Sequence, residues 1–288
     1  MSTVPPLLQA LIDDAAAFPP RSAPLGEALR AHRAHLEGWY ADLLGPLLVP
    51  ASAVPRLVAA LDAADGAPPG GDPLRVAVVA DTGLDGLAPA YAALAAEPRL
   101  EAAWAEVALP AGSDLVSGAG EAIGVAFDAA PFLEFDLFVE VPRSPGWEEA
   151  LDVLADSGSA SAKLRTGGAD AAAYPSEAEL AAFLHACTAR DLPFKLTAGL
   201  HRAVRHTDPD TGFEHHGFLN VLLAALDARD GADEESLARR LADRDAEQLA
   251  AAANAAAEER RGGWVSFGSC SVAEPLADLV ELGLLDEG

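Results

Sequence analysis

Only two lysines occur in this chain of 288 residues, and every other Lys or Arg position is arginine. Lys163 lies in the segment SAKLRTGG, and Lys195 lies in PFKLTAGLHR. A lysine amine can lose its proton in a protein interior and then attack a carbonyl carbon, whereas a guanidinium stays protonated. The sparing use of lysine therefore makes these two positions candidates for a titratable amine.

Both lysines lie among apolar residues and precede a turn that contains glycine. If the two segments form neighbouring strands, their backbones lie about 4.8 Å apart. Two ammonium groups that share a partly dehydrated cavity repel each other, so the less costly state leaves one amine neutral. The pair therefore predicts a lysine that forms a Schiff base. The ordinary alternative is a lysine at a strand end that reaches solvent or pairs with a carboxylate.

Short apolar segments recur along the chain and alternate with alanine-rich segments of helical periodicity. We expect eight strands, within residues 7–18, 45–52, 74–83, 100–110, 135–142, 159–168, 192–201 and 263–272. Segments such as 88–98, 146–158 and 175–191 predict helices, and Pro175-Ser176 marks the start of the last one. Apolar strands that alternate with helices are typical of a parallel sheet covered on both faces.

A closed (β/α)8 TIM barrel is the simplest arrangement of this pattern, and the length suits one domain over residues 1–288. An open doubly wound sheet stays possible, although no G-x-G-x-x-G motif follows the first strand. Residues 203–262, between the seventh and eighth strands, form too long a connection for a simple loop, so we expect a helical insertion. In such barrels the active site lies at the C-terminal ends of the strands, where both lysines are expected.

The formal net charge is −26, which argues against nucleic acid or anionic membranes as partners because like charges repel. No signal-like segment opens the sequence, and no stretch of about 20 apolar residues lacks charges or prolines. Cys187 and Cys270 have neither disulfide nor metal-site spacing. We therefore expect a cytoplasmic protein that acts on a small molecule without a cofactor, with a homodimer as the commonest oligomeric default.

Seven fragments occur in a characteristic order along the chain. They are LIDDAAAFPP (11–20), LRVAVVADTG (74–83), WAEVALP (104–110), LFVEVP (137–142), KLRTGG (163–168), FKLTAGLHR (194–202) and VSFGSCS (265–271). Together they resemble deoxyribose-phosphate aldolase and its class I aldolase relatives over nearly the whole expected barrel. The resemblance implies a lyase that forms or cleaves a carbon–carbon bond through a lysine Schiff base with a small aldehyde or keto substrate.

The resemblance also implies roles for individual residues. Lys163 matches the Schiff-base lysine, and Lys195 matches the second lysine, which lowers the pKa of the first and joins a proton relay. Glu106 stands where the family has an aspartate that works with this relay and a water, and its longer side chain changes the geometry. Asp13 and Glu140 match further acidic positions, where they could equally be hydrogen-bond acceptors in the core.

A phosphate pocket in the loops after the last three strands is a further implication of the resemblance. The candidate substrate- or anion-binding residues are Arg165, Thr166, Gly167, Gly168, Gly199, His201, Gly268, Ser269 and Ser271. N–H groups at the start of a helix near Ala273 could hold an anion. Arg165 replaces the small polar residue of the family, shares a strand face with Lys163, and could bind a carboxylate or phosphate. A phosphorylated aldehyde and a carboxylated carbonyl compound are therefore both candidate substrates.

The expected insertion contains side chains that could bind a divalent metal, although the main prediction includes no metal. These side chains are His206, Asp208, Asp210, Glu214, His215 and His216. They form no H-E-x-x-H motif. Two alternatives to an aldolase therefore stay open: a metal-assisted lyase or hydrolase that uses the insertion histidines, and a non-catalytic barrel that binds a ligand.

Overall fold

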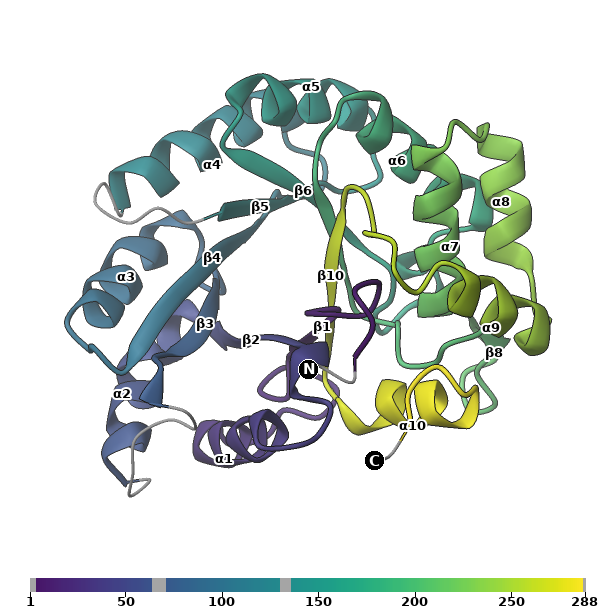
Figure 1. Cartoon of the computed structure of the whole chain (residues 1–288). Helices are drawn as coiled ribbons and strands as arrows, with labels where there is room; N and C mark the ends of the chain where they lie inside the picture. Colours follow the sequence, from purple (N-terminus) through teal and green to yellow (C-terminus); the bar gives the residue numbers. More distant parts are fainter. Residues whose placement is uncertain (1–3, 64–70, 130–135, 287–288) are drawn as a thin grey trace.

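The structure, a computed structural model, describes residues 4–63, 71–129 and 136–286. Eight parallel strands form a closed barrel with helices around it (Figure 1). The strands follow one another around the barrel in the order β1, β10, β7, β6, β5, β4, β3, β2. The chain therefore folds as the (β/α)8 barrel that the sequence predicts. The remaining residues of the expected domain, including residue 135 of the expected fifth strand, lie outside the described residues.

Each expected strand segment coincides with one barrel strand. The strands are β1 (Ile12–Asp14), β2 (Leu44–Pro50), β3 (Leu74–Val79), β4 (Leu100–Ala108), β5 (Asp136–Glu140), β6 (Ala160–Arg165), β7 (Phe194–Thr197) and β10 (Trp264–Ser269). Most are shorter than expected, because the residues that flank them belong to turns and loops. The largest difference is at β1, where residues 6–10 of the apolar segment form turns instead of strand.

Helices cover the outside of the barrel (Figure 1). They include α1 (Leu25–Leu36), α2 (Val54–Ala63), α3 (Leu87–Ala95), α4 (Leu115–Ala129), α5 (Trp147–Ser157), α6 (Glu177–Ala189) and α10 (Ala273–Glu281). Helix α6 begins where the sequence predicts: Ser176 Oγ accepts a hydrogen bond from the Glu179 N–H, and the Glu179 carboxylate accepts one from the Ser176 N–H. This reciprocal pair satisfies two N–H groups that a helix start otherwise leaves unpaired.

The connection from β7 to β10 contains three helices. It begins with a short antiparallel hairpin, β8 (His206–Thr207) and β9 (Glu214–His215), which the sequence did not predict. The helices are α7 (Phe218–Arg229), α8 (Glu234–Ala242) and α9 (Ala246–Ala255). Helix α7 is buried over nearly its whole length and contacts α6, α8 and α9. The other two helices therefore form an outer cover on this side.

The barrel closes between β1 and β10, and Arg261 reinforces this seam. Its guanidinium donates hydrogen bonds to the carbonyl oxygens of Leu7 (2.9 Å) and Gln9 (2.6 Å), which precede β1. It also donates to the carbonyl oxygens of Trp264 (3.2 Å) and Val265 (2.6 Å) in β10. Burial lowers the pKa of Arg261 to about 10, so the side chain stays charged at neutral pH. One cation therefore links segments from opposite ends of the chain.

An apolar layer fills part of the barrel interior beneath the polar side chains. It consists of Ala15, Leu48, Ala77, Trp104 and Phe138. The rings of Trp104 and Phe138 meet edge to face with centroids 5.5 Å apart. Glu106 and Glu140 follow these two residues by two positions on the same strands, so they point inward one layer nearer the C-terminal ends. The fold thus places buried carboxylates directly above an apolar floor.

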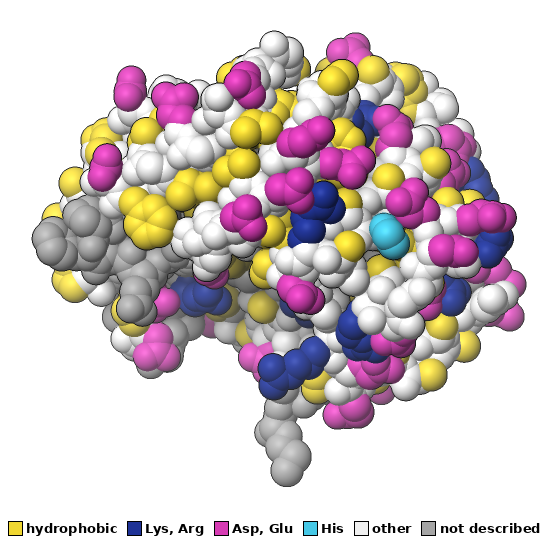
Figure 2. Space-filling model, turned by 90° about the horizontal axis from the view of Figure 1, so that it is seen from above, with side chains coloured by type: hydrophobic (Ala, Val, Ile, Leu, Met, Phe, Trp, Pro, Cys, Tyr) yellow, Lys and Arg dark blue, Asp and Glu magenta, His cyan; other side chains and the backbone are white. Residues whose placement is uncertain are grey.

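The excess of acidic residues is displayed on the surface. Figure 2 shows acidic side chains spread over the visible face, with arginines among them. In the described part of the chain, no helix is both long enough and apolar enough to span a bilayer.

Candidate active site

The two lysines lie side by side in the barrel wall. Lys163 on β6 pairs in register with Lys195 on β7, and both side chains are buried. The carboxylate of Glu106 lies between them: its Oε2 is 2.8 Å from Lys163 Nζ, and its Oε1 contacts Lys195 Nζ. Trp104 Nε1 donates a hydrogen bond of 2.9 Å to the same Oε1. A single carboxylate thus bridges the two amines.

Lys195 is enclosed on every side. Its Nζ lies 2.6 Å from Asp13 Oδ2 and 4.5 Å from the centroid of the Trp104 ring, where a cation is attracted to the ring face. The side chain has no exposed surface. Ser266 Oγ donates a 2.6 Å hydrogen bond to the same Asp13 oxygen. Lys195 can therefore orient Glu106 but has no open space in which to meet a ligand.

Asp13 faces the floor of this cluster from β1. Burial raises the pKa of Asp13, although Lys195 and Ser266 favour the charged form. Its second oxygen, Oδ1, has no hydrogen-bond partner among the described residues. A Cβ atom on Gly45 of β2 would lie 2.1 Å from this oxygen, so only glycine leaves room for Asp13. Asp13 therefore binds a proton more readily than an exposed aspartate does.

Lys163 also contacts a second carboxylate, nearer the mouth of the barrel. Glu140 Oε2 is 2.9 Å from Lys163 Nζ, and Glu140 Oε1 accepts a 2.8 Å hydrogen bond from Arg165 Nε. Half of the Arg165 side chain is exposed, whereas that of Lys163 is 5% exposed. Side chains of opposite charge thus alternate in a row. The row begins at Lys195 in the closed interior, continues with Glu106, Lys163 and Glu140, and ends at the accessible guanidinium of Arg165.

The charge state of this cluster differs from the one expected for two repelling amines. Burial alone would lower the pKa of Lys163, but the carboxylates of Glu106 and Glu140 raise it overall. Burial would likewise raise the pKa of Glu106, yet the two ammonium groups hold it well below its ordinary value. The pKa of Glu140 is lowered in the same way by Lys163 and Arg165. In the resting site, both amines are therefore paired with carboxylates instead of repelling each other.

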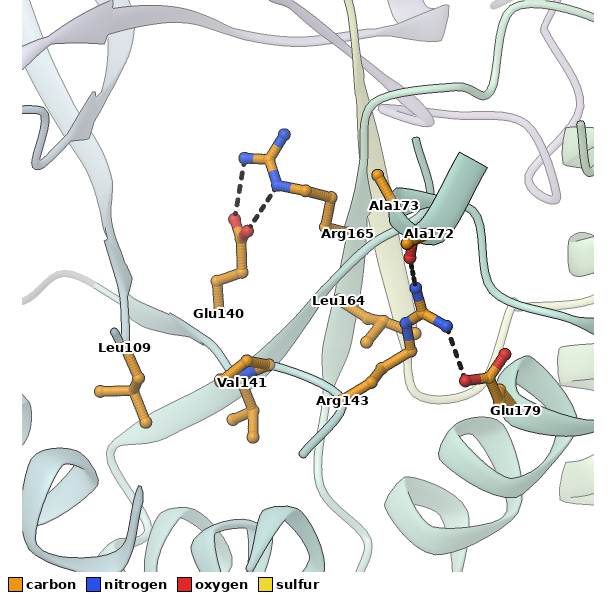
Figure 3. Close-up of a pocket in the computed structure, with 10 residues that line it drawn as sticks. Leu109, Glu140, Val141, Arg143, Leu164, Arg165, Ala172, Ala173 and Glu179 are labelled. Carbon is orange, nitrogen blue, oxygen red and sulfur yellow. Dashed lines mark hydrogen bonds and ion pairs between the residues drawn. The ribbon is translucent and has the colours of Figure 1, made fainter. Parts of the chain in front are cut away.

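A cavity of about 410 Å³ opens beside Glu140 and Arg165, between the loops that follow β4, β5 and β6 (Figure 3). It is lined by Leu109, Glu140, Val141, Pro142, Arg143, Leu164, Arg165, Ala172, Ala173 and Glu179. Arg143 donates to Glu179 Oε1 (2.7 Å) and to the carbonyl oxygen of Ala172. The guanidinium groups of Arg143 and Arg165 therefore line the cavity. Lys163 contacts Glu140, which also lines it.

The loops after β6 and β7 are locked to each other. Thr166 Oγ1 donates to the carbonyl oxygen of Ala198 at 2.5 Å. Gly199 has a φ of +79°, and a Cβ on Gly167 would lie 2.8 Å from its Cα. A Cβ on Gly168 would lie 2.7 Å from that of Ala173. Close backbone packing thus accounts for the glycines at 167 and 199.

The loop after β10 binds mainly to itself and to the loop after β7. Ser269 Oγ donates to the carbonyl oxygen of Ser271 (2.8 Å), and Ser271 Oγ accepts from the Glu274 N–H (3.4 Å). A Cβ atom on Gly268 would lie 3.2 Å from Leu48 Cδ1, and His201 Nδ1 lies 2.9 Å from Glu274 Oε2. Of the nine candidate anion-binding residues, Arg165 joins the lysine cluster, and the other eight contact neighbouring loops or strands.

Three residues of the site were missed by the sequence interpretation. Trp104 precedes Glu106 by two residues and so shares its strand face, which is a usable signal. Ser266 is one of two serines in β10, and its partner Asp13 could be found only from the closure of the barrel. Arg143 had no local signal, because its partner Glu179 lies 36 residues away in α6, beyond α5 and β6.

The insertion histidines form no metal centre. His206 and His215 pair across the β8–β9 hairpin with ring centroids 5.1 Å apart. No group of three or more His, Cys, Asp or Glu side chains within residues 4–63, 71–129 and 136–286 is placed to hold a metal ion. The metal-assisted alternative therefore has no ligand set in this part of the chain.

His216 instead joins the insertion to the start of α6. Its Nε2 lies 2.8 Å from the carbonyl oxygen of Pro175, and Arg205 Nη1 lies 3.3 Å from its Nδ1. Because the guanidinium can only donate, Nδ1 must accept, and Nε2 carries the proton. Burial lowers the pKa of His216 to about 4. The imidazole is therefore held neutral.

Acidification should weaken the fold through this histidine. The unfolded chain binds a proton at His216 near pH 6.5, whereas the folded chain does so only near pH 4. The free energy of unfolding should therefore fall by about 3 kcal/mol between pH 7 and pH 4 from this group alone. Urea unfolding at both pH values, for the wild type and for His216→Gln, measures the difference. Parallel losses in the two proteins would contradict the assignment.

Comparisons with known proteins do not assign the chain to a family. No protein-family model matches the chain, and no curated protein matches its sequence.

Proposed function

We propose that the chain is a class I aldolase-type lyase in which Lys163 forms a Schiff base with a small aldehyde or keto substrate. The observation that carries the proposal is the position of the Glu106 carboxylate between the only two lysine amines, inside a barrel of a type that is commonly enzymatic. The fold alone does not select a reaction, because unrelated chemistries share it.

Lys163 is the better nucleophile of the two amines. Lys195 has no exposed surface and is held by Asp13, Glu106 and the Trp104 ring. Lys163 lies behind Glu140, whose other oxygen faces Arg165 and the cavity. A carbonyl compound that enters the cavity and displaces Glu140 from Lys163 removes one of the two anions that raise the pKa of this amine. Substrate binding thus promotes loss of the proton.

Glu106 can carry the proton through each step. It accepts a proton from Lys163, whose free amine then attacks the carbonyl carbon and forms a carbinolamine. The protonated Glu106 returns the proton to the hydroxyl group, which leaves as water, and an iminium remains. The carboxylate next removes a proton from the adjacent carbon to give an enamine, which adds to an acceptor aldehyde. The reverse sequence cleaves the same carbon–carbon bond.

Arg165 supports a substrate with an anionic group. Its guanidinium is half exposed and is held on one side by Glu140. A carboxylate or phosphate on the carbonyl compound can bind it through two hydrogen bonds. We therefore include small carboxylated or phosphorylated carbonyl compounds in the proposed substrate class, with no cofactor required by the steps above.

Borohydride trapping tests the proposal directly. The protein is incubated with acetaldehyde, glycolaldehyde phosphate or pyruvate, reduced, and mapped by peptide mass spectrometry. We expect a stable secondary amine on Lys163 with at least one of these compounds, and no adduct in Lys163→Arg. Reduction that marks Lys195 instead, or no lysine with any of the three, would reject the assignment and favour a non-catalytic ligand-binding barrel.

A further inference from the structure

A second group of reactive side chains lies at the C-terminal end of the barrel, outside the lysine cluster. Cys270 directly follows β10, and His201 lies in the loop after β7. Glu274 is in the first turn of α10. Cys270 Sγ lies 4.0 Å from His201 Nε2, and His201 Nδ1 lies 2.9 Å from Glu274 Oε2. A thiol, an imidazole and a carboxylate thus lie in sequence, with the imidazole in the middle.

This order matches a nucleophile, a base that removes its proton, and a third group that orients the base. If Glu274 accepts a hydrogen bond from Nδ1–H, the lone pair on Nε2 of His201 faces the sulfur. The distance of 4.0 Å is long, but such contacts commonly tighten when a substrate binds. Cys270 is half-buried and the His201 side chain is 24% exposed, so neither residue is sealed in the core.

The surroundings of the sulfur show why a base is needed. Burial raises the pKa of Cys270, and the nearby Glu274 carboxylate raises it further. The Arg21 N–H and the guanidinium of Arg21 favour the thiolate, but they do not outweigh burial. The resting thiol is therefore protonated at neutral pH, and it becomes a good nucleophile only if a neighbour removes its proton during the attack.

We propose that Cys270 is the nucleophile of a second reactive site, with His201 as its base and Glu274 as a positioning residue, and that its electrophile is an aldehyde. The sulfur forms a bond to the carbonyl carbon as the carbon–oxygen π bond breaks. His201 takes the thiol proton and delivers it to the carbonyl oxygen, which gives a thiohemiacetal without oxidation or reduction. The reverse step releases the aldehyde.

The choice of an aldehyde rests on the proposed function, whereas the nucleophilic thiol does not. Cys270 lies at the same end of the barrel as the carboxyl ends of β6 and β7, where Lys163 is proposed to act. An aldehyde that is supplied to Lys163 therefore also meets the loop that carries Cys270.

The chain contains its own control, because Cys187 is its only other cysteine. Cys187 lies in α6, has no exposed surface, and has a pKa raised by burial. Alkylation by iodoacetamide at pH 7.5 is followed on the two cysteine peptides by mass spectrometry. Cys270 should react while Cys187 stays protected, and continued protection of Cys187 in each variant reports an intact fold.

Loss of the base should slow the reaction of Cys270. We expect His201→Gln to lower its alkylation rate constant by about tenfold or more, since a positioned base contributes at least this much. Glu274→Gln should lower it by a smaller factor, because the imidazole remains but is less well oriented. Equal rate constants in the wild type and both variants, with Cys187 protected throughout, would overturn the proposal.

The electrophile is tested in the Lys163→Met protein, where no Schiff base can form at that position. Acetaldehyde should slow alkylation of Cys270 at concentrations that leave the alkylation of N-acetylcysteine unchanged. Absence of this protection would overturn the aldehyde as its substrate. Neither result depends on borohydride trapping at Lys163, so failure of the lyase proposal and failure of the thiol site can be told apart.

Discussion

In a Glu106→Gln protein, we expect the lyase turnover to fall about 10²–10⁴-fold while Lys163 still forms the adduct trapped by borohydride. Glutamine has nearly the same shape, but its amide has one acceptor oxygen and one NH2 donor, so it can accept on only one side of the bridge, and it cannot take up a proton as the carboxylate does. The steps in which Glu106 carries a proton should therefore be slow, including formation of the Schiff base, but reduction by borohydride still accumulates the adduct because trapping needs one capture whereas turnover needs every step. Removal of this anion should also lower the pKa of Lys163, so trapping should extend to lower pH.

Glu140→Gln is the matched control for this experiment. It also removes an anion 2.9 Å from Lys163 Nζ, so it should shift the pH dependence of trapping in the same direction. It leaves the carboxylate between the two lysines in place, so turnover should fall far less. Both measurements use the same aldehyde, with trapping and turnover followed across pH 6–10, a range chosen to span the ordinary pKa of lysine. A similar loss of turnover in the two variants would contradict a specific role of Glu106.

The second large effect concerns stability. Lys195→Met should lower the free energy of unfolding by about 3–5 kcal/mol, because it leaves buried Asp13 without its cation and Glu106 with only one. Asp13 should respond by binding a proton, since its pKa is already raised by burial. The pKa of Asp13 is higher in the folded chain than in the unfolded chain, where it is near 3.8. Proton binding by Asp13 therefore adds its full contribution to the free energy of unfolding below pH 3.8, and this contribution is lost as the pH rises through the folded pKa. The destabilisation should therefore shrink as the pH is lowered.

Chemical unfolding of Lys195→Met at pH 7 and pH 5 measures this effect. The double variant with Asp13→Asn is the control, because it removes the carboxyl charge together with the ammonium. We expect the double variant to recover part of the lost stability at pH 7. No recovery would mean that lost packing against Trp104 and Phe138, and not the unpaired charge, determines the cost.

The fold could be predicted from the sequence because the barrel depends on local patterns that repeat. Eight apolar segments mark the strands, and Ser176 with Glu179 marks the start of α6. β1 was predicted too long, because buried residues such as Leu7 and Leu8 are equally apolar although they lie in turns. The β8–β9 hairpin was missed because its strands have only two residues each, too few to show an alternating pattern.

The site was only partly predictable. Strand periodicity and neighbouring strand order bring Lys163 and Lys195 together, so their proximity follows from the sequence. The bridge through Glu106 does not, because β4 and β7 are separated in the barrel wall by two other strands. Whether a carboxylate spans that distance depends on side-chain length and on the diameter of the barrel. The family resemblance associates Glu106 with the lysine relay, but not with a bridge between both amines, and this bridge reverses the direction of the pKa shift of Lys163 that two amines alone would produce.

The seam held by Arg261 has a consequence for how the polypeptide matures in the cell. Strand β1 leaves the ribosome well before its partner β10 and the guanidinium that clamps it, because both are synthesised more than 240 residues later. Until then one edge of β1 offers unpaired backbone groups, and contacts of such long sequence separation form slowly. Ring closure should therefore come late in folding, after β10 has been synthesised, and the nascent chain should depend most on chaperones just before it.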